Sequence, residues 1–377
     1  MNQLYLFSAP GRTEISGNHT DHQHGCVLAA AVDLQTVAEV TMNGTRQIRV
    51  YSEGYPAVFV NINQLEVREE EKCTTAALVR GVAAAFSQRG AKLQGFDMVA
   101  HSNVLPGSGL SSSAAFEVLL GTIFNELFFD KKLSPVEIAQ IGQYAENVYF
   151  GKPCGLMDQM ASAVGSMVYI DFADPSQPVV EKVDFDFQKA GYALCIIDSG
   201  ADHADLTDEY AAITHELKQL CAFFGKEYLR QIPEEDFMSA MPQLRGRVPD
   251  RAILRAFHVY QENARVRDQV AALKAGDVDT FLQLVKASGQ SSWMYLQNIY
   301  PAGAVDRQPM AFALALCERL LQGRGACRVH GGGFAGTVQA FVPLDLLNYF
   351  RDTIEANLGS GSCHVLQIRP YGGIRVK

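Results

Sequence analysis

The chain of 377 residues lacks three patterns that would each indicate a particular class of protein. Its eight cysteines are scattered and form no CxxC pair, which fits reduced thiols and argues against a disulfide scaffold or a zinc site. No cluster of lysines and arginines offers a surface for a nucleic-acid backbone, and the net charge of −9 argues the same way. No stretch reaches the roughly 18 apolar residues that a membrane span needs. We therefore expect neither a nucleic-acid partner nor a membrane-bound protein.

The first residues, MNQLYLFSAPGR, also lack the basic segment and long apolar run of a secretory signal, so we expect a cytoplasmic protein. The chain contains no internal repeat and no low-complexity tract. A hydrophobic fraction of 48% with 19% charged residues is ordinary for a soluble globular enzyme. Because the chain is longer than most single hydrophobic cores, we expect two domains.

Helical and strand-like patterns alternate along the chain and predict an α+β protein. A short strand at 4–8 is expected to end at Pro10-Gly11, and strands at 37–41 and 47–51 to pair around an Asn43-Gly44 turn. Ser134 and Glu137 predict a capping box that opens a helix toward residue 150. Further helices are predicted at 74–89, 112–128, 209–224, 252–275, 281–288, 309–321 and 344–357, and further strands at 96–101, 168–172, 193–198, 326–330, 338–342 and 364–368. We expect an N-terminal domain at 1–180 and a two-layer C-terminal domain at 181–377.

The segment LPGSGLSSSAAFE at 105–117 has few large side chains and precedes a helical pattern. Its backbone N–H groups can close around an anion, and a helix beginning near Ser111 would add unpaired donors and the positive end of its dipole. Consecutive hydroxyls can complete the hydrogen bonds of a phosphate or contact Mg²⁺. Phosphate binding is the first hypothesis, and a flexible turn is the alternative.

Three further segments collect polar groups. APGRTEISGNHTDHQHG at 9–25 is turn-rich and could bind a hydroxyl-rich ligand, although a solvated loop or a histidine metal site would also fit. AENVYFGKPCGLMDQM at 145–160 holds Glu146 and Asp158 on either side of a tight loop, where one carboxylate could bind magnesium and the other act as a base. RVHGGGFAGT at 328–337 leaves its backbone open to close approach, or forms only a tight turn.

Taken together and in this order, the four segments resemble the galactokinase branch of the GHMP small-molecule kinases. The first is similar to the signature GRVNLIGEHTDYNGG, the serine-rich segment to the phosphate motif GLSSSA, and CGLMDQ to CGIMDQ. RVHGGGFAGT resembles the third, glycine-rich motif of the family. The resemblance extends from Ala9 to about Val342. It implies a ribosomal-S5-like N-terminal domain and a ferredoxin-like C-terminal domain, with the active site between them.

The resemblance also implies a reaction, in which ATP phosphorylates the C1 hydroxyl of α-galactose. Asp158 is then the catalytic base or the group that orients this hydroxyl, and Arg12 keeps Asp158 ionised and neutralises charge on the transferring phosphoryl. Mg²⁺ is expected on Ser112 and Glu146. The residues expected to bind ATP are Gly107, Ser108, Gly109, Leu110, Ser111, Ser112 and Ser113, and those expected to bind the sugar are Asn18, His19, Asp21, Gly155 and Tyr210. We expect a monomer.

Several positions differ from the family pattern. Glu14 stands in place of asparagine, Asn18 in place of glutamate, His22 in place of tyrosine and Gln23 in place of asparagine. In the family, the glutamate at the position of Asn18 contacts the sugar at the end that carries the C6 hydroxyl. Asparagine removes this negative charge and with it the repulsion against a C6 carboxylate, so a galacturonate 1-kinase is the alternative assignment. The aromatic residues common near the adenine pocket are missing around residues 74–79.

Other classes of protein are less well supported. A non-catalytic sugar sensor related to galactokinases would be expected to lose small residues of the serine-rich segment, but Ser113-Ala114-Ala115, Asp158 and Arg12 are all present. A dinucleotide-binding oxidoreductase is disfavoured because no GxGxxG motif follows a first strand.

Overall fold

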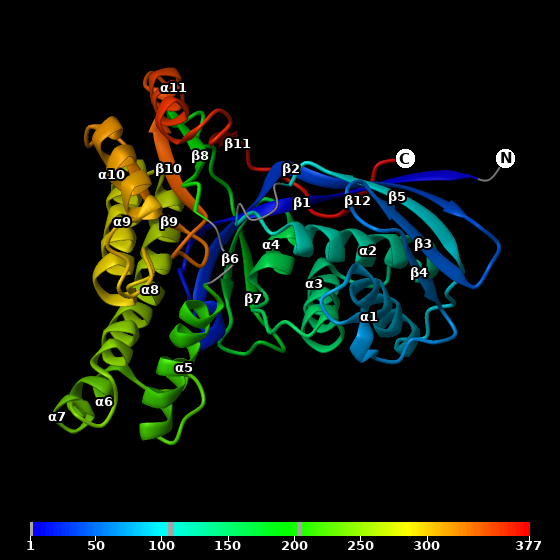
Figure 1. Cartoon of the computed structure of the whole chain (residues 1–377), viewed down its shortest axis with the longest axis horizontal. Helices are drawn as coiled ribbons and strands as arrows, with labels where there is room; N and C mark the ends of the chain where they lie inside the picture. Colours follow the sequence, from blue (N-terminus) through cyan, green and yellow to red (C-terminus); the bar gives the residue numbers. More distant parts are fainter. Residues whose placement is uncertain (1–2, 105–108, 202–205) are drawn as a thin grey trace.

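The computed structural model describes residues 3–104, 109–201 and 206–377, and it divides into two lobes (Figure 1). Four helices lie under one face of the first lobe's eight-stranded sheet. The strands are β1 (Leu4–Ser16), β2 (Cys26–Met42), β3 (Gln47–Ser52), β4 (Val58–Asn61), β5 (Phe96–Ser102), β6 (Met167–Asp171), β7 (Val179–Val183) and β12 (Ile374–Arg375). The helices are α1 (Thr75–Gln88), α2 (Ser112–Phe128), α3 (Pro135–Tyr144) and α4 (Met157–Val164).

The second lobe contains a four-stranded antiparallel sheet in the order β11-β8-β10-β9. Counted along the chain, this is the 4-1-3-2 order of a ferredoxin-like sheet, so that expectation is confirmed. The strands are β8 (Tyr192–Asp198), β9 (Ala326–His330), β10 (Thr337–Pro343) and β11 (Cys363–Leu366). The helices are α5 (Thr207–Phe223), α6 (Glu234–Ser239), α7 (Met241–Leu244), α8 (Asp250–Ala275), α9 (Val278–Ser291), α10 (Pro309–Leu321) and α11 (Leu347–Leu358).

Several predicted elements are confirmed because their signals are local. The helix at 112–128, the helix at 309–321 and the strand at 326–330 have the predicted bounds. Ser134 and Glu137 form the predicted capping box, and a π-helical turn at Ala145–Phe150 carries the helix to residue 150.

Two predictions about the first sheet are wrong. β1 does not end at Pro10-Gly11 but continues to Ser16, because irregularities in its pairing with β2 accommodate this segment. The strands on either side of Asn43-Gly44 do not form a hairpin, because β5 lies between β2 and β3 and pairs with both. The polar segment at 9–25 therefore begins inside a strand.

A two-layer second domain is expected, but helices pack on both faces of its sheet and form a third layer. α10 and α11 cover one face of the four-stranded sheet, and α8 and α9 pack on its other face. Residues Leu28, Ala30 and Val32 of β2 share that second core with Leu194 and Ile196 of β8. β2 therefore joins the two lobes, and the first-lobe strand β12 is contributed by the C-terminal residues. A division of the chain at residue 180 stays a prediction.

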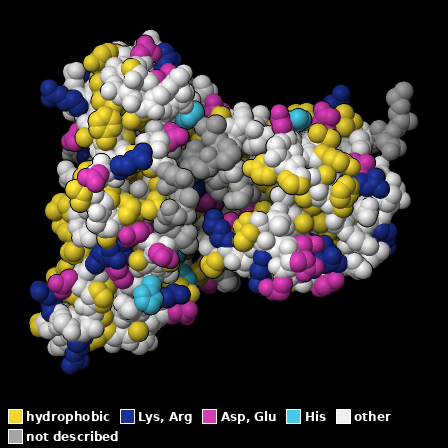
Figure 2. Space-filling view, viewed as in Figure 1, with side chains coloured by type: hydrophobic (Ala, Val, Ile, Leu, Met, Phe, Trp, Pro, Cys, Tyr) yellow, Lys and Arg dark blue, Asp and Glu magenta, His cyan; other side chains and the backbone are white. Residues whose placement is uncertain are grey.

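Among the described residues, no helix has both the length and the apolar character needed to cross a membrane. In the space-filling view, Lys and Arg side chains are interspersed with Asp and Glu on the visible face (Figure 2).

Candidate active site

The centre of the site is a partly buried ion pair between Arg12 of β1 and Asp158 in the first turn of α4. Nε and Nη2 of Arg12 each donate to one carboxylate oxygen of Asp158 at 2.7 Å. The remaining Nη1 donates to the carbonyl oxygen of Gly109, and the Arg12 backbone N–H donates to Leu110 at 3.0 Å. The Arg12 side chain is 8% exposed and that of Asp158 31%. One arginine thus connects β1, α4 and the serine-rich segment.

Burial would raise the pKa of Asp158, but the charge and hydrogen bonds of Arg12 outweigh it and lower that pKa below its usual value. A hydrogen bond with Ser111 adds to this effect. Asp158 is therefore ionised at neutral pH, and its open edge can accept a hydrogen bond.

The serine-rich segment ends at the N-terminus of α2. Ser111 has a left-handed backbone, with φ of 55°, and α2 begins at Ser112. Ser112 and Ser113 are partly exposed in the first turn, where unpaired N–H groups favour an anion. Gly109 is required, because its φ is +71° and a Cβ would lie 3.1 Å from Nδ1 of His330. Of the expected ATP-binding residues, Gly107 and Ser108 lie outside the described residues.

Glu146 lies in the π-helical turn and meets a second carboxylate. Nε2 of Gln159 donates to Oε2 of Glu146 and to Oε2 of Glu117, in both cases at 2.9 Å. The other Glu117 oxygen is buried without a hydrogen-bond partner. Burial, followed by the charge of Glu146, raises the pKa of Glu117 well above its usual value. Two carboxylates therefore converge on one amide beside Asp158.

This donor set fits Mg²⁺, which binds oxygen and commonly uses only one or two carboxylates when phosphates and waters supply the rest. No group of three or more potential metal-ligating side chains occurs within residues 3–104, 109–201 and 206–377. That finding gives no support to a histidine metal site at 9–25, and His24 instead stacks on Tyr228 with ring centroids 3.7 Å apart.

The loop after β1 contributes Asp21 and His19. Burial, together with the charge of Asp158, raises the pKa of Asp21 to about 6. A Cβ on Gly155 would lie only 1.9 Å from the Asp21 carboxylate, so glycine allows these two segments to meet. Nε2 of His19 donates to the carbonyl of Gly332 at 3.0 Å, and its Nδ1 therefore accepts from His22 at 3.1 Å.

Both histidines are neutral at physiological pH. Burial and the neighbouring His22 lower the pKa of His19 to about 3, and burial lowers that of His22 to about 4. They can exchange hydrogen bonds with a neutral ligand without adding charge.

Asn18 is fully buried and bonded to protein groups. Its Nδ2 donates to Oε1 of Glu14 at 3.1 Å and to the carbonyl of Gly331 at 2.5 Å. Its Oδ1 accepts from Nδ2 of Asn298 at 2.9 Å. Glu14 also forms a buried ion pair with Arg328 at 2.8 Å. Asn18 thus bonds to the backbone of the glycine-rich motif through Gly331.

Tyr210 of α5 reaches the same glycine-rich motif. Its hydroxyl donates to the carbonyl of Gly333 at 2.7 Å, and a Cβ on Gly332 would lie 2.5 Å from its ring. The structure thus brings Asn18, His19 and Tyr210 together around residues 331–333. Their contact with a sugar stays a prediction.

Three residues of the site received no role from the sequence. Glu117 stands four residues after Ser113 on α2, a spacing that places both on one helix face and could have indicated it. Gln159 belongs to the CGLMDQ segment. His330 is the third residue of the RVHGGGFAGT motif, and its Nε2 accepts from the backbone N–H of Glu14 at 3.2 Å.

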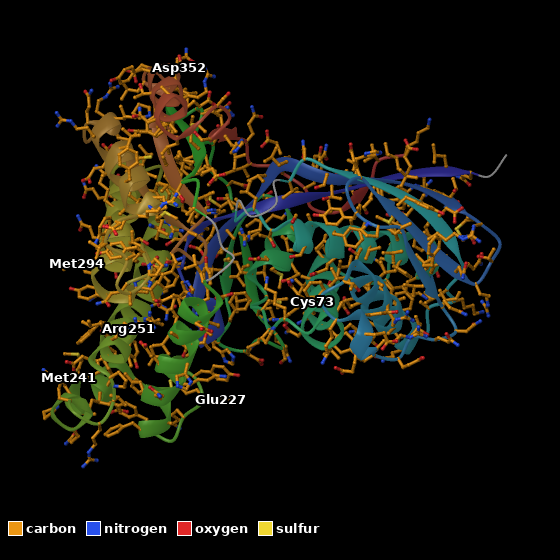
Figure 3. The ribbon with its side chains drawn as sticks, in the orientation of Figure 1. Cys73, Glu227, Met241, Arg251, Met294 and Asp352 are labelled. Atoms are coloured by element: carbon orange, nitrogen blue, oxygen red, sulfur yellow. The ribbon has the colours of Figure 1, made fainter. Side chains whose placement is uncertain are left out.

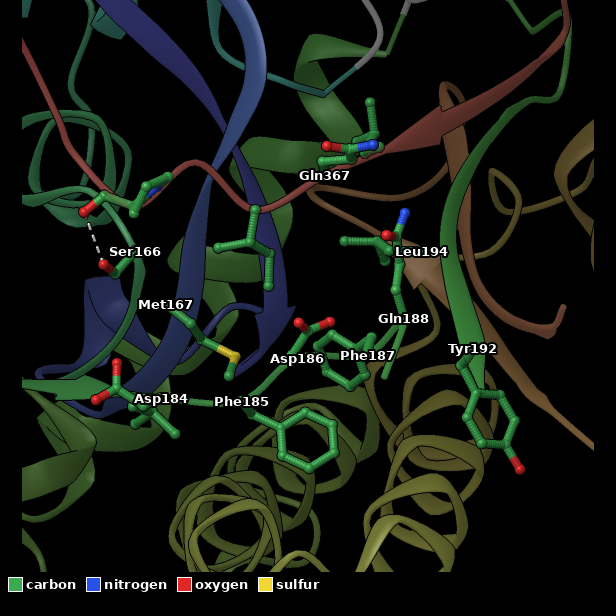
Figure 4. Close-up of a pocket in the computed structure, with 14 residues that line it drawn as sticks. Ser166, Met167, Asp184, Phe185, Asp186, Phe187, Gln188, Tyr192, Leu194 and Gln367 are labelled. Carbon is green, nitrogen blue, oxygen red and sulfur yellow. Dashed lines mark hydrogen bonds between the residues drawn. The ribbon is translucent and has the colours of Figure 1, made fainter. Parts of the chain in front are cut away.

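The cavity drawn in Figure 4 lies apart from the candidate active site. It measures about 290 Å³ and lies between residues 183–188 and 366–370. None of the predicted site residues lines it.

Comparisons with known proteins agree with this geometry. Residues 77–166 match the model of the GHMP kinases N terminal domain, and residues 2–42 match the galactokinase galactose-binding signature. The crystal structure of Lactococcus lactis galactokinase complexed with galactose is 26% identical, with a TM-score of 0.83 over 99% of this chain and 95% of that chain.

More distant structures share the fold. A mevalonate kinase from Methanococcus jannaschii is 12% identical, with a TM-score of 0.66 over 98% of each chain. A D-glycero-D-manno-heptose 1-phosphate kinase from Bacteroides thetaiotaomicron is 14% identical, with a TM-score of 0.65 over 100% of this chain and 99% of that chain.

The two-lobed fold and the serine-rich segment at a helix N-terminus define a small-molecule phosphotransferase. With the two family matches, they show that the chain belongs to the GHMP kinases. Within that family it is a sugar kinase that carries the galactokinase signature.

The Arg12→Lys variant tests the central ion pair. Lysine keeps the charge but cannot donate to both Asp158 oxygens and Gly109 together, so we expect kcat/KM to fall by about 100-fold. Steady-state kinetics would measure this. Arg49→Lys, at an exposed ion pair with Asp97 on the same sheet, is the control and should be close to wild type. A similar loss in both variants would contradict a special role for Arg12.

Proposed function

We propose that this protein is a galactokinase, which transfers the γ-phosphoryl group of ATP to the C1 hydroxyl of α-D-galactose. The observation that carries the proposal is the Arg12–Asp158 ion pair with its two hydrogen bonds, which joins β1 and α4 to the serine-rich segment. The galactokinase signature match at residues 2–42 supports galactose as the sugar.

In this proposal Asp158 accepts the hydrogen bond of the C1 hydroxyl and orients its oxygen toward the phosphoryl group. Because Arg12 lowers its pKa, Asp158 is a weak base in the free protein, which favours orientation first and proton transfer late in the reaction. Arg12 then offsets charge at the phosphoryl oxygens, while the first turn of α2 binds the phosphates through Ser111, Ser112 and Ser113.

Ser112 and Glu146 would hold Mg²⁺, which when bound neutralises the phosphate oxygens. Gln159 holds the Glu146 carboxylate in place. Residues 107–113 would enclose the phosphates, as the sequence predicts.

The sugar is assigned to the surface formed by His19, Asp21, Gly155 and Tyr210, with Asn18 beneath it. In the described residues of this surface, each arginine is already paired, Arg12 with Asp158 and Arg328 with Glu14. The neutral histidines add no positive charge. Among the described residues of this surface, a carboxylate at C6 would therefore meet paired arginines and neutral histidines, which supports galactose over galacturonate.

We also propose that the enzyme acts in the cytoplasm as a monomer. All eight cysteines lie in the described part of the chain and are free thiols, as a reducing compartment would leave them.

A sugar panel tests the assignment. ADP release should be measured with galactose, galacturonate, N-acetylgalactosamine, glucose and arabinose in the presence of Mg²⁺-ATP. We expect the highest kcat/KM with galactose and little turnover of galacturonate. Preference for galacturonate would overturn the proposed sugar, and no turnover of any sugar would overturn the kinase assignment.

The Asp158→Asn variant tests the role of the carboxylate. Loss of its charge and acceptor capacity should lower kcat by about 10²- to 10⁴-fold while ATP still binds. Asp171→Asn, which loses an ion pair with Arg230 outside the site, is the matched control. Rates for Asp158→Asn equal to those of the control would refute the assignment.

The pKa of about 6 for Asp21 predicts a pH dependence for sugar recognition. Above this pH the ionised carboxylate accepts hydrogen bonds from sugar hydroxyls, and below it protonation removes that capacity, so kcat/KM for galactose should fall by about tenfold per pH unit. His19 and His22, at about 3 and 4, do not titrate in this range.

Steady-state kinetics between pH 5 and about 8 at saturating ATP would measure the profile. Asp21→Asn should be impaired throughout and lack the decline near pH 6. Persistence of that decline in Asp21→Asn would assign it to another group.

A further inference from the structure

The segment between β1 and β2, residues 17–25, has an unusual backbone and is called here the sugar loop. Gly17 has φ of +99°, and the non-glycine residues His19 and His24 have φ of +59° and +57°. Left-handed conformations are costly for residues with a Cβ, so surrounding contacts must hold the loop in this shape.

Those contacts come from one face of α8. Nε2 of His258 donates to the carbonyl of Asn18 at 2.9 Å. Glu262 accepts from the backbone N–H of Gly17 at 3.2 Å, and Asn263 accepts from that of Cys26 at 2.7 Å. The spacing of four residues places His258 and Glu262 on one side of the helix, and Asn263 follows directly after Glu262. α8 therefore bonds to the backbone at both ends of the sugar loop.

Glu262 is completely buried, and both of its carboxylate oxygens have protein partners. The oxygen that accepts from Gly17 also accepts from Ser288 at 2.7 Å and from Ser16 at 3.4 Å, and the other oxygen pairs with Arg265. Burial would raise the pKa of Glu262, but Arg265 and the neighbouring cations lower it to about 2. A fixed negative charge is thus held beneath the start of the loop.

His258 is equally buried and has a defined hydrogen-bond direction. A carbonyl oxygen can only accept, so Nε2 carries the proton toward Asn18, and Nδ1 accepts from the hydroxyl of Ser291 at 2.9 Å. The residue that follows Asn18 is His19, whose ring faces Gly332. A shift of the Asn18 carbonyl would therefore move His19.

We propose that His258 and Glu262 of α8 are positioning residues for the sugar, acting through the backbone of Asn18 and Gly17. They touch neither substrate, and they set the geometry in which His19 and Asp21 meet the sugar hydroxyls. This inference rests on the proposed function, since it assumes that the sugar loop binds the sugar. The nucleotide is bound by other segments, so the two substrates should respond differently.

The first test compares Glu262→Ala with Glu262→Gln. Glutamine keeps an acceptor for Gly17 and loses only the charge, whereas alanine removes both. We expect alanine to raise KM for galactose by about tenfold or more with KM for ATP unchanged, and glutamine to raise it less. Glu216→Gln is the matched control, because Glu216 pairs with Arg251 and Arg255 of the same helix without contacting the sugar loop (Arg251 is labelled in Figure 3).

His258 provides a second pair of variants if loss of Glu262 prevents folding. Glutamine can donate to Asn18 and accept from Ser291, so His258→Gln should keep a galactose KM near wild type, while His258→Leu should raise it. Galactose should also increase the melting temperature of His258→Leu less than that of wild type, with an unchanged increase from ADP and Mg²⁺.

An unchanged galactose KM in both Glu262→Ala and His258→Leu would overturn the inference, as would an equal rise in both substrate KM values. These outcomes are separate from failure of the proposed function. If wild type does not phosphorylate galactose, the function is wrong, whereas an active wild type with unaffected variants rejects only the positioning role.

Discussion

The site depends on how the donors of Arg12 are used. Two go to Asp158, one goes to Gly109, and the backbone of the same residue bonds Leu110. An unpaired guanidinium N–H at this depth would be costly, so β1, α4 and the serine-rich segment can meet in few arrangements. The pairing of β1 with β2 is irregular between Pro10 and Arg12, and the strand continues past Pro10 to include Arg12. The contact between these three segments thus depends on one buried arginine.

The same chemical group has different properties within this small region. Asp158 is held ionised by Arg12, Asp21 has its pKa raised to about 6, and the pKa of Glu117 lies well above its usual value. The differences follow from burial and from the sign of the nearest charge. The histidines of the sugar surface are neutral, and Arg12 and Arg328 are each paired with a carboxylate. Burial and neighbouring charges, more than residue type, therefore set the pKa of each carboxylate.

Predictions from the sequence are confirmed where the signal is local. The capping box at Ser134 and the bounds of α2 follow from side chains within a few residues of each other. The Asn43-Gly44 turn signal was equally local but wrong, because β5, more than 50 residues further along the chain, pairs between the two strands. Pairing between distant strands depends on how their buried faces fit together, which no short window contains. The helices at 252–275 and 281–288 are predicted correctly as α8 and α9, but their packing on the second face of the ferredoxin-like sheet is not, for the same reason.

The sequence by itself determined the four ordered motifs, the family and the residues that carry charge, since these depend on residue identity and order. Tertiary structure decided what each residue contacts. It buried Asn18 among Glu14, Gly331 and Asn298, and it brought Glu117 and Gln159 to Glu146. It also placed His258 and Glu262 of α8 beneath a loop more than 230 residues earlier. Burial and long-range hydrogen bonds arise only when the chain has folded, so no local sequence pattern predicts them.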